Sequence, residues 1–450
     1  MKNGSAENIA QDVVKRAVKA GVSGAEVMVQ EEEEFSTTVR LGKIESLKEA
    51  ASKGLGLRLL WGTRSASSYT SDFSPASLQR LVERTVTMAK ATSEDPVGVL
   101  PEKEWMAGEV EDLGLYWPDV AELETDKKVE LARRAEEAAL TADKRITNSE
   151  GGSFESGVGR RVLANSLGFV GSYRSSSCWV TVTPLAEQDG NKQRNYWYSV
   201  SRSLRDLEEP EAVGRKAAER VLRRLGARKV ETCHVPIIYD AETARSIVGH
   251  MFEAARGDAV YRSASFLTGK LGEKLGPERL TIWDDGLRPG GFGSRPFDDE
   301  GVKSRVTPLV EKGTLRNYLL NCYSARKLGL KTTANARRGL SGPTSVGPNN
   351  LYLEPGTRSP DQIIRSVDRG FYVTELMGFG SNIVTGDYSR GAAGLWIEKG
   401  ELTYPVEEVT IAGNLKQMYM NLEEVGNDLT FRGSTASPTL LITGMTVAGT

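Results

Sequence analysis

The most regular pattern of apolar and polar positions in the chain begins at Asp240 and runs to about Gly269. The preceding residues, Val235 to Tyr239, form a short apolar run that predicts a buried strand. After it, apolar residues recur at three- and four-residue spacing: Ala241, Ala244, Ile247, Val248, Met251 and Ala255. This spacing places them on one face of a helix, and Asp240 is a favoured residue type at a helix N-cap. We expect the second half of the chain to be organised around this amphipathic helix.

A second pattern occurs twice in residues 1–226: a helix, several extended segments, and a helix that opens with proline. In the first occurrence Ser5 caps the opening helix, and Gly42 and Gly62 mark hairpin turns between strands. In the second occurrence the two helices span about 126–142 and 210–225. Between these, Ser177, Trp179, Thr181 and Thr183 alternate with Cys178, Val180 and Val182. This alternation predicts a strand with one buried face, on which Cys178 belongs to the core.

From Val230 onwards glycine becomes frequent and short alternating strands dominate. Turns such as Glu311 to Thr314 and Glu398 to Glu401 join them, as is typical of antiparallel meanders. We predict an α+β protein. Its N-terminal half is a duplicated helix–strands–helix unit, and its C-terminal half is a β-rich sheet or partly closed barrel around the central helix. The predicted domains are residues 1–226, with units at about 1–95 and 124–226 joined by a linker at 96–123, and residues 227–450.

The composition excludes several classes of protein. A net charge of −2 without a cluster of Lys and Arg argues against a nucleic-acid surface. The three cysteines are too few and too scattered for a disulfide framework. The N-terminus lacks the apolar core of a signal peptide, and the longest apolar run is about half the length of a membrane span. We therefore expect a cytoplasmic protein that binds neither nucleic acid nor membrane.

Candidate chemistry is sparse, because the chain has only two histidines, His234 and His250. A catalytic zinc needs about three protein ligands and an open position for water. Acidic and basic clusters leave alternatives open. The clusters are Asp284 with Asp285, Asp298 with Asp299, the run Glu31 to Glu34, and Arg337 with Arg338. The aspartates could bind a hard cation or line a peptide groove, but Asp-Gly turns need no ligand. The glutamate run is most simply a solvated strand end or edge, and the arginines could hold a peptide carboxylate or lie on the surface.

Three stretches resemble the TldD/PmbA family, which is also known as modulator of DNA gyrase. They are residues 39–96, the helix after Asp240, and residues 298–338, which end in the run Thr332 to Arg338. In the TldD branch this helix carries His-Glu-x-x-x-His, and a further metal ligand is a Cys near the C-terminus. If His250 is the second His, the first His and the Glu become Arg245 and Ser246. If Glu253 takes that place, they become Val248 and Gly249, and no Cys follows Cys322. The chain is therefore similar to the TldE/PmbA branch.

The resemblance implies a subunit without catalytic or metal-binding residues of its own. A TldD-like partner would hold the zinc, and the two subunits would form a metalloprotease for unfolded or small peptides. The motif-equivalent positions Val248, Gly249, His250 and Glu253 are then not catalytic. An alternative is a freestanding homodimer that binds peptides or a partner protein without cleaving them. A third hypothesis is an independent metal hydrolase that uses His250 with the Asp284 or Asp298 cluster.

Overall fold

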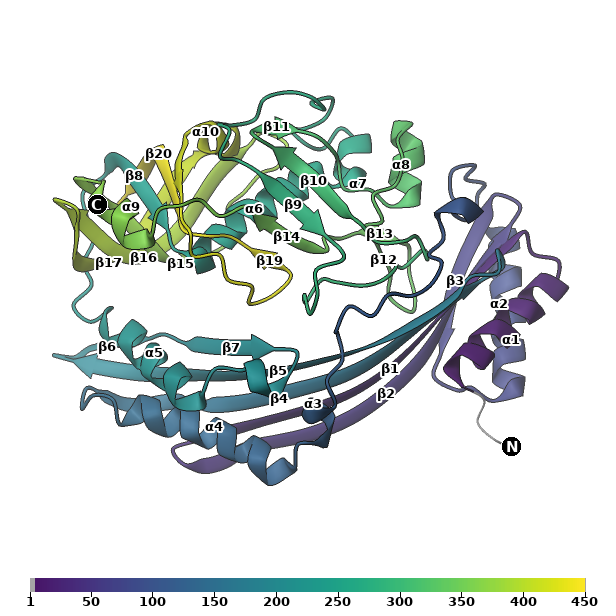
Figure 1. Cartoon of the computed structure of the whole chain (residues 1–450), viewed down its shortest axis with the longest axis horizontal. Coiled ribbons are helices and arrows are strands. Elements are labelled where there is room, and N and C mark those ends of the chain that lie inside the picture. The colour runs from purple at the N-terminus through teal and green to yellow at the C-terminus, as the bar shows by residue number, and fades with distance from the viewer. Residues whose placement is uncertain (1–4, 450) are drawn as a thin grey trace.

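One seven-stranded antiparallel sheet takes in the strands of the whole N-terminal half. The computed structural model describes residues 5–449, and it orders the sheet β3-β2-β1-β4-β5-β6, with β7 also paired to β5. The strands are β1 (Gly24–Arg40), β2 (Lys43–Trp61), β3 (Arg64–Thr70), β4 (Ile146–Asn165), β5 (Val170–Gln188), β6 (Asn191–Arg194) and β7 (Trp197–Ser201). The predicted hairpin turns at Gly42 and Gly62 are confirmed, and both glycines have positive φ. Figure 1 shows how strongly these long strands curve.

Two groups of helices lie on one face of this sheet. The first comprises α1 (Ala6–Lys19) and α2 (Pro75–Ala91), and the second comprises α3 (Pro118–Glu122), α4 (Thr125–Leu140) and α5 (Pro210–Leu222). Val29 packs with the first group and Phe35 with the second. Because residues an even number apart on a strand share a face, both groups cover the same side, which is the convex one in Figure 1.

The helix–strands–helix pattern thus occurs twice, as predicted. Its two copies meet through their first strands, because β1 and β4 pair antiparallel from Glu26 and Asn165 to Val39 and Gly152. The alternation in β5 is also confirmed. Cys178, Val180 and Val182 are buried under the helices, whereas Trp179 and its polar neighbours face the other side. Burial raises the pKa of the Cys178 thiol to about 12, in line with a core residue.

The C-terminal half contains a closed five-stranded barrel. Its strands are β8 (Cys233–Tyr239), β15 (Arg369–Met377), β16 (Asp387–Glu398), β17 (Glu401–Asn414) and β20 (Leu440–Ala448). The ring closes because β17 pairs with β20 as well as with β16, and β18 (Leu422–Val425) adds to β20. A second sheet runs β11-β10-β9-β14-β19. Its strands are β9 (Ile282–Asp285), β10 (Val306–Glu311), β11 (Thr314–Leu315), β14 (Asn350–Leu353) and β19 (Thr435–Ala436).

The central helix α6 (Ala241–Ala255) lies between the barrel and this second sheet (Figure 1). Asp240 caps it, accepting a hydrogen bond from the Thr243 backbone N–H at 2.8 Å. Apart from Ala241, which is only partly buried, the predicted apolar stripe lies in the largest core cluster, where Ile247, Val248 and Met251 pack against both sheets. The α+β fold class with a barrel beside a central helix is therefore confirmed.

Smaller elements complete the C-terminal half. They are α7 (Gly257–Tyr261), α8 (Cys322–Leu328), α9 (Pro360–Arg365), α10 (Leu415–Met420), β12 (Ala336–Arg337) and β13 (Ser345–Val346). Within residues 5–449, no helix is long and apolar enough to cross a membrane. Residues 96–123, predicted as a linker, include a short 3-10 helix (Lys103–Trp105) and α3. They touch both halves: Ala107 donates to Gly301 O at 2.9 Å, and Leu115 O accepts from Ser176 N at 2.9 Å.

The C-terminal half rests on the concave face of the N-terminal sheet (Figure 1). Gly54 and Gly56 of β2 allow a close approach there, because a Cβ atom at either position would overlap with Leu340. Two glycines at this spacing also occur in dinucleotide-binding loops, but such a loop needs a third glycine, which is missing here. The contacts with Leu340 show that these glycines serve close packing.

Buried ion pairs fix the same contact. Glu26 accepts from Arg58 at 2.7 Å and lies 3.6 Å from Arg338. Asp299 accepts from Arg161 at 2.7 Å and from the Arg338 backbone N–H at 2.8 Å. A buried charge is tolerated only when it is paired and hydrogen-bonded. Because a shift of one half against the other would break these pairs, they stabilise a single relative placement of the two halves.

We predict that Glu26→Gln lowers the free energy of unfolding by about 3 kcal/mol, because it leaves two buried guanidinium groups without their carboxylate. The matched control is Glu32→Gln, an exposed position of the same strand on the same face, with an expected change within about 0.5 kcal/mol. Urea denaturation measures both. Equal stability of the two variants would show that the ion pairs do not hold the halves together.

Candidate functional site

Helix α6 presents a polar face opposite its buried stripe. This face carries Arg245, Ser246, Gly249, His250 and Glu253, all partly exposed, whereas Val248 is 1% exposed. Of the two alignments considered from the sequence, only the one that starts at Arg245 and Ser246 uses positions on the polar face. The alignment that starts at Val248 would require a ligand inside the hydrophobic core.

The residues at these positions make ordinary protein contacts. Arg245 Nη1 donates to the Tyr198 hydroxyl at 2.9 Å, and its guanidinium lies 3.4 Å from Glu242. Ser246 Oγ donates to the Thr243 carbonyl oxygen at 2.7 Å. Glu253 forms an ion pair with Arg256 at 3.2 Å. Arg245 and Ser246 have no carboxylate or thiolate to offer a metal ion, and the carboxylate of Glu253 is already paired with Arg256.

His250 is partly buried between α6 and the barrel. Its Nδ1 lies 3.2 Å from Ser381 Oγ, its ring packs edge-on against Tyr388, and its Nε2 is buried without a hydrogen-bond partner. Burial, together with the nearby Arg390 guanidinium, lowers the pKa of His250 to about 4. The imidazole is therefore neutral at pH 7, and no group within residues 5–449 forms a hydrogen bond with Nε2.

The predicted acidic and basic clusters lie mostly inside the protein. Asp284 accepts hydrogen bonds from Asn335 Nδ2 at 2.7 Å and from Asn349 N at 2.7 Å. Asp298 accepts from three backbone N–H groups, those of Glu300, Val302 and Ala336. Burial, reinforced by the neighbouring Glu300 carboxylate, raises the pKa of Asp298 to about 8, and burial also raises the pKa of Asp284. Their oxygens are occupied by protein donors, as in structural turns.

The remaining members of these clusters also make internal contacts. Asp285 accepts from the Leu287 backbone N–H at 2.8 Å, within a turn. Arg337 donates to the Pro348 carbonyl oxygen and lies 3.3 Å from Asn349 Oδ1. Arg338 and Asp299 belong to the buried ion pairs on the concave face. The structure therefore does not bring these residues together with His250, and the polar face of α6 stands apart from them.

A cavity of about 200 Å³ opens beside the polar face of α6, between the two halves of the chain. Both halves contribute to its wall: Asn195, Tyr196, Trp197, Tyr198 and Arg220 come from the first, and Glu242, Thr243, Arg245, Ser246, Thr374, Glu375, Leu376 and Arg390 from the second. Sequence reasoning missed this cavity. Arg390 and Tyr198 stand in strands without a recognisable motif, and only the chain fold places them next to α6.

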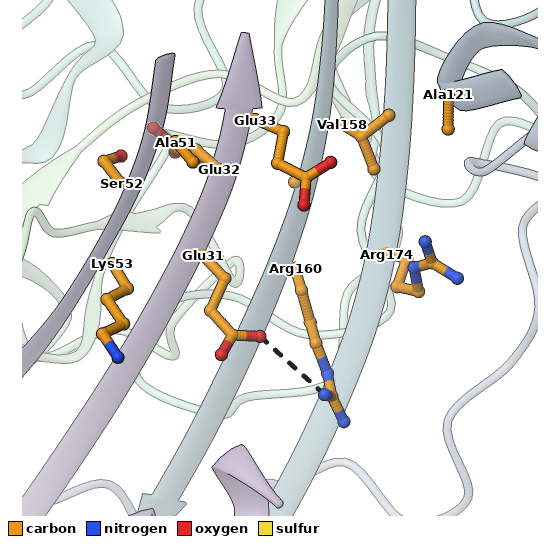
Figure 2. A pocket seen from close by; sticks show the side chains of 11 residues that line it. Glu31, Glu32, Glu33, Ala51, Ser52, Lys53, Ala121, Val158, Arg160 and Arg174 are labelled. Atoms are coloured by element: carbon orange, nitrogen blue, oxygen red, sulfur yellow. Dashed lines mark ion pairs between the residues drawn. The ribbon is translucent and has the colours of Figure 1, made fainter. Parts of the chain in front are cut away.

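A larger groove of about 790 Å³ lies over β1, β2, β4 and β5 beside α3, and Figure 2 shows the side chains that line it. They include Glu31 to Glu33 of the acidic run in β1, together with Lys53, Arg160 and Arg174. The run was expected at a strand end or edge. It lies instead inside β1, which pairs with β2 on one side and β4 on the other. Glu31 lies 3.8 Å from Arg160, which also binds Glu7 at 2.6 Å, so opposite charges compensate each other here.

Comparison with known proteins identifies the family. Family models match the chain in three parts: PmbA/TldA metallopeptidase domain 1 at residues 25–89, the central domain at 118–225, and the C-terminal domain at 232–449. The chain is 41% identical to Metalloprotease PmbA of Escherichia coli O157:H7, over 95% of this chain and 92% of that protein. It belongs to the PmbA/TldD metallopeptidase family.

Further members of the PmbA/TldD family support the assignment. A Metalloprotease PmbA homolog from Haemophilus influenzae is 37% identical over 97% of this chain and 94% of its own length. A crystal structure from Bacteroides thetaiotaomicron, described as a modulator of DNA gyrase, has a TM-score of 0.92 at 30% identity and covers 100% of both chains. TldE from Thermococcus kodakarensis has a TM-score of 0.87 at 23% identity, covers 98% of this chain and 100% of its own, and shows the shared fold.

The PmbA/TldD family name implies a metal, but the residues of this chain do not fit one. Among residues 5–449, no group of three or more His, Cys, Asp or Glu side chains is placed to hold a metal ion. On α6, a single neutral imidazole stands beside Arg390, and a guanidinium next to a cation would repel it. The donor set therefore lacks both the number and the charge of a zinc site.

We predict that Val248→Asp unfolds the C-terminal half, because an unpaired charge in the core costs several kcal/mol, comparable to the stability of a domain. The control is Ser246→Asp, which places the same charge on the polar face of the same helix and is expected to leave the fold intact. Limited proteolysis and circular dichroism distinguish the two variants. A Val248→Asp protein as resistant as Ser246→Asp would contradict the burial of this stripe.

We also predict that the purified chain contains well under one zinc ion per molecule, because Arg245 and Ser246 stand at the positions of the first His and the Glu, and no Cys follows Cys322. Elemental analysis after gel filtration in metal-containing buffer measures this. About one tightly held zinc per chain would contradict the assignment of the α6 face as a site without metal ligands.

Proposed function

We propose that this chain is the non-catalytic, TldE/PmbA-like subunit of a cytoplasmic TldD/TldE-type metalloprotease that degrades or processes unfolded or small peptides. The zinc would lie on a TldD-like partner. One observation carries the proposal. Helix α6 and the core around it are intact, but its polar face has Arg245, Ser246 and a neutral His250 instead of a ligand set. A metallopeptidase fold without a set of metal ligands is most simply explained by a role in binding and assembly.

The free strand edges support a role in peptide or subunit binding. The barrel strands are closed into a ring, so their edges are mostly paired. In β2, by contrast, β3 pairs only with residues 55–61, and no strand of the described chain pairs with that side of residues 43–54. An extended peptide or a partner strand can add to such an edge through backbone hydrogen bonds, which gives low sequence selectivity. Only an unfolded segment can bind in this way, and folded proteins would be spared.

Exposed apolar side chains support association with a second subunit. The end of β15 exposes Met377, and the loop after it exposes Phe379 and Val384. The β1–β2 hairpin exposes Leu41, Ile44 and Leu47. Phe379 is fully exposed between two glycines. Clusters of exposed apolar residues on a soluble protein mark interaction sites.

The test compares the chain alone, a TldD-like homologue alone, and the mixture, with a flexible peptide as substrate. We expect no hydrolysis by this chain alone and cleavage by the mixture. Cleavage should stop when a chelator is added and when the zinc-binding His of the partner is changed, because the metal activates the attacking water.

Cleavage by this chain alone in the presence of chelator would overturn the proposal. If the two proteins neither co-purify nor cooperate, and this chain is a dimer that binds the peptide intact, the alternative of a freestanding homodimeric binding protein is supported instead. Gel filtration with light scattering distinguishes these assemblies.

A further inference from the structure

The cavity beside α6 contains a cation without a counter-ion. Arg390 of β16 lines it, and within residues 5–449 its guanidinium forms no ion pair and no hydrogen bond. Its Nε is buried without an acceptor. Arg390 is partly buried, and a guanidinium without a protein acceptor favours an acceptor supplied from outside, which would offset the cost of that burial.

The carboxylates around the cavity are already neutralised. Glu375 forms an ion pair with Arg224. Glu242 lies 3.3 Å from Arg432 and 3.4 Å from Arg245. The remaining carboxylate nearby, Asp240 at the N-cap of α6, is paired with Arg220 at 3.7 Å. These pairs leave the positive charge of Arg390 as the uncompensated charge of the cavity, which therefore favours an anion.

The size and the wall of the cavity indicate that it accommodates only one end of a ligand. Its volume of about 200 Å³ is below the roughly 300–1,000 Å³ of sites that enclose a drug-sized molecule. Tyr196 and Tyr198 stack at its rim, with Tyr196 about half exposed, and provide an apolar surface for the rest of the ligand. Arg245 on α6 adjoins them through its hydrogen bond to the Tyr198 hydroxyl and brings a second guanidinium to the wall.

We propose that this cavity binds a carboxylate, with Arg390 as its main partner and Arg245 as a second donor. The planar guanidinium matches a carboxylate with two parallel hydrogen bonds. The carboxylate belongs to a peptide, either at its C-terminus or on an acidic side chain. This choice of source rests on the proposed function, whereas the carboxylate site itself does not. The bound peptide end would lie along the polar face of α6, at the contact between the two halves.

His250 provides a built-in reporter of binding. The charged or titratable groups that face it are Arg390 and Tyr388, both from β16. In the free chain, burial and Arg390 lower the pKa of His250 to about 4, below the ordinary 6.5. A carboxylate on Arg390 would offset the guanidinium charge, so the pKa of His250 should rise while burial keeps it below the ordinary value.

The experiment follows the histidine ring protons by NMR in the full chain, in which His250 and His234 are the only histidines. His234 lies exposed on β8 and serves as the internal control. N-acetylglycine is titrated as the carboxylate probe and N-acetylglycinamide as its uncharged match. We expect N-acetylglycine to shift the His250 signals and to raise its pKa, and the amide to do neither.

Variants assign the effect to Arg390. Arg390→Gln should weaken binding of N-acetylglycine by at least about tenfold and raise the pKa of His250 in the free chain. Arg390→Lys keeps the charge without the fork and should bind with intermediate affinity. Arg84→Gln makes the same charge change at an exposed position of α2 and should bind like the unaltered chain. The NMR spectrum of each variant shows whether it is folded.

Peptide arms separate the two sources of the carboxylate. One flexible, fluorescently labelled peptide is prepared with a free C-terminus, with an amidated C-terminus, and with an amidated C-terminus plus an internal Glu. If amidation lowers the anisotropy and the internal Glu does not restore it, the site binds the peptide C-terminus. If the internal Glu restores the anisotropy, the site also accepts acidic side chains.

Equal His250 shifts from N-acetylglycine and its amide, or unchanged N-acetylglycine binding in Arg390→Gln, would overturn the proposal. These arms need no partner subunit and no cleavage. A chain that fails to support proteolysis but passes them would retain the carboxylate site, and a chain that supports proteolysis but fails them would lose only this inference.

Discussion

The seating of the C-terminal half on the concave face of the N-terminal sheet is the contact on which the candidate site depends. Gly54 and Gly56 let Leu340 come against the sheet, and Glu26 pairs with Arg58 and Arg338 in the same region. A side chain at either glycine would separate the two surfaces, and a slip of the halves would leave buried charges unpaired. The cavity beside α6 takes its walls from both halves. Its shape is therefore set by this distant contact as much as by the residues that line it.

In helix α6 the residues that stabilise the fold are separate from the residues of the polar face. Its stability rests on the buried stripe and on the Asp240 cap, and these residues are separate from the polar face. Arg245 and Ser246 can therefore occupy the polar face at no cost to the core. The same division explains why the sequence pattern predicts the helix well but says little about what its polar face binds.

The features that were predictable from the sequence are those that neighbouring residues determine. The caps at Ser5 and Asp240, the turns at Gly42 and Gly62, and the alternation of β5 each depend on a few adjacent positions. The buried ion pairs could not be predicted, because Glu26 and Arg338 are far apart in sequence and each alone looks like a surface residue. The acidic run of β1 was assigned to an edge for the same reason, since its pairing with β4 is a long-range contact. Arg390 carries no local signal in the sequence, and its significance comes only from the fold, in which its guanidinium has no partner among residues 5–449.

A guanidinium beside α6 offers a bound ligand different chemistry from that of a metal ion. Both a zinc ion and an arginine attract carboxylate and carbonyl oxygens, but a zinc ion also lowers the pKa of its bound water to about 7 and so generates a nucleophile. Arginine stays protonated and supplies only hydrogen bonds and charge. His250, with its lowered pKa, is neutral at pH 7 and has no carboxylate beside it to orient it as a base. Under the proposed function, the polar face of α6 would hold and orient one end of a peptide, and the peptide bond would be broken by chemistry on the partner subunit.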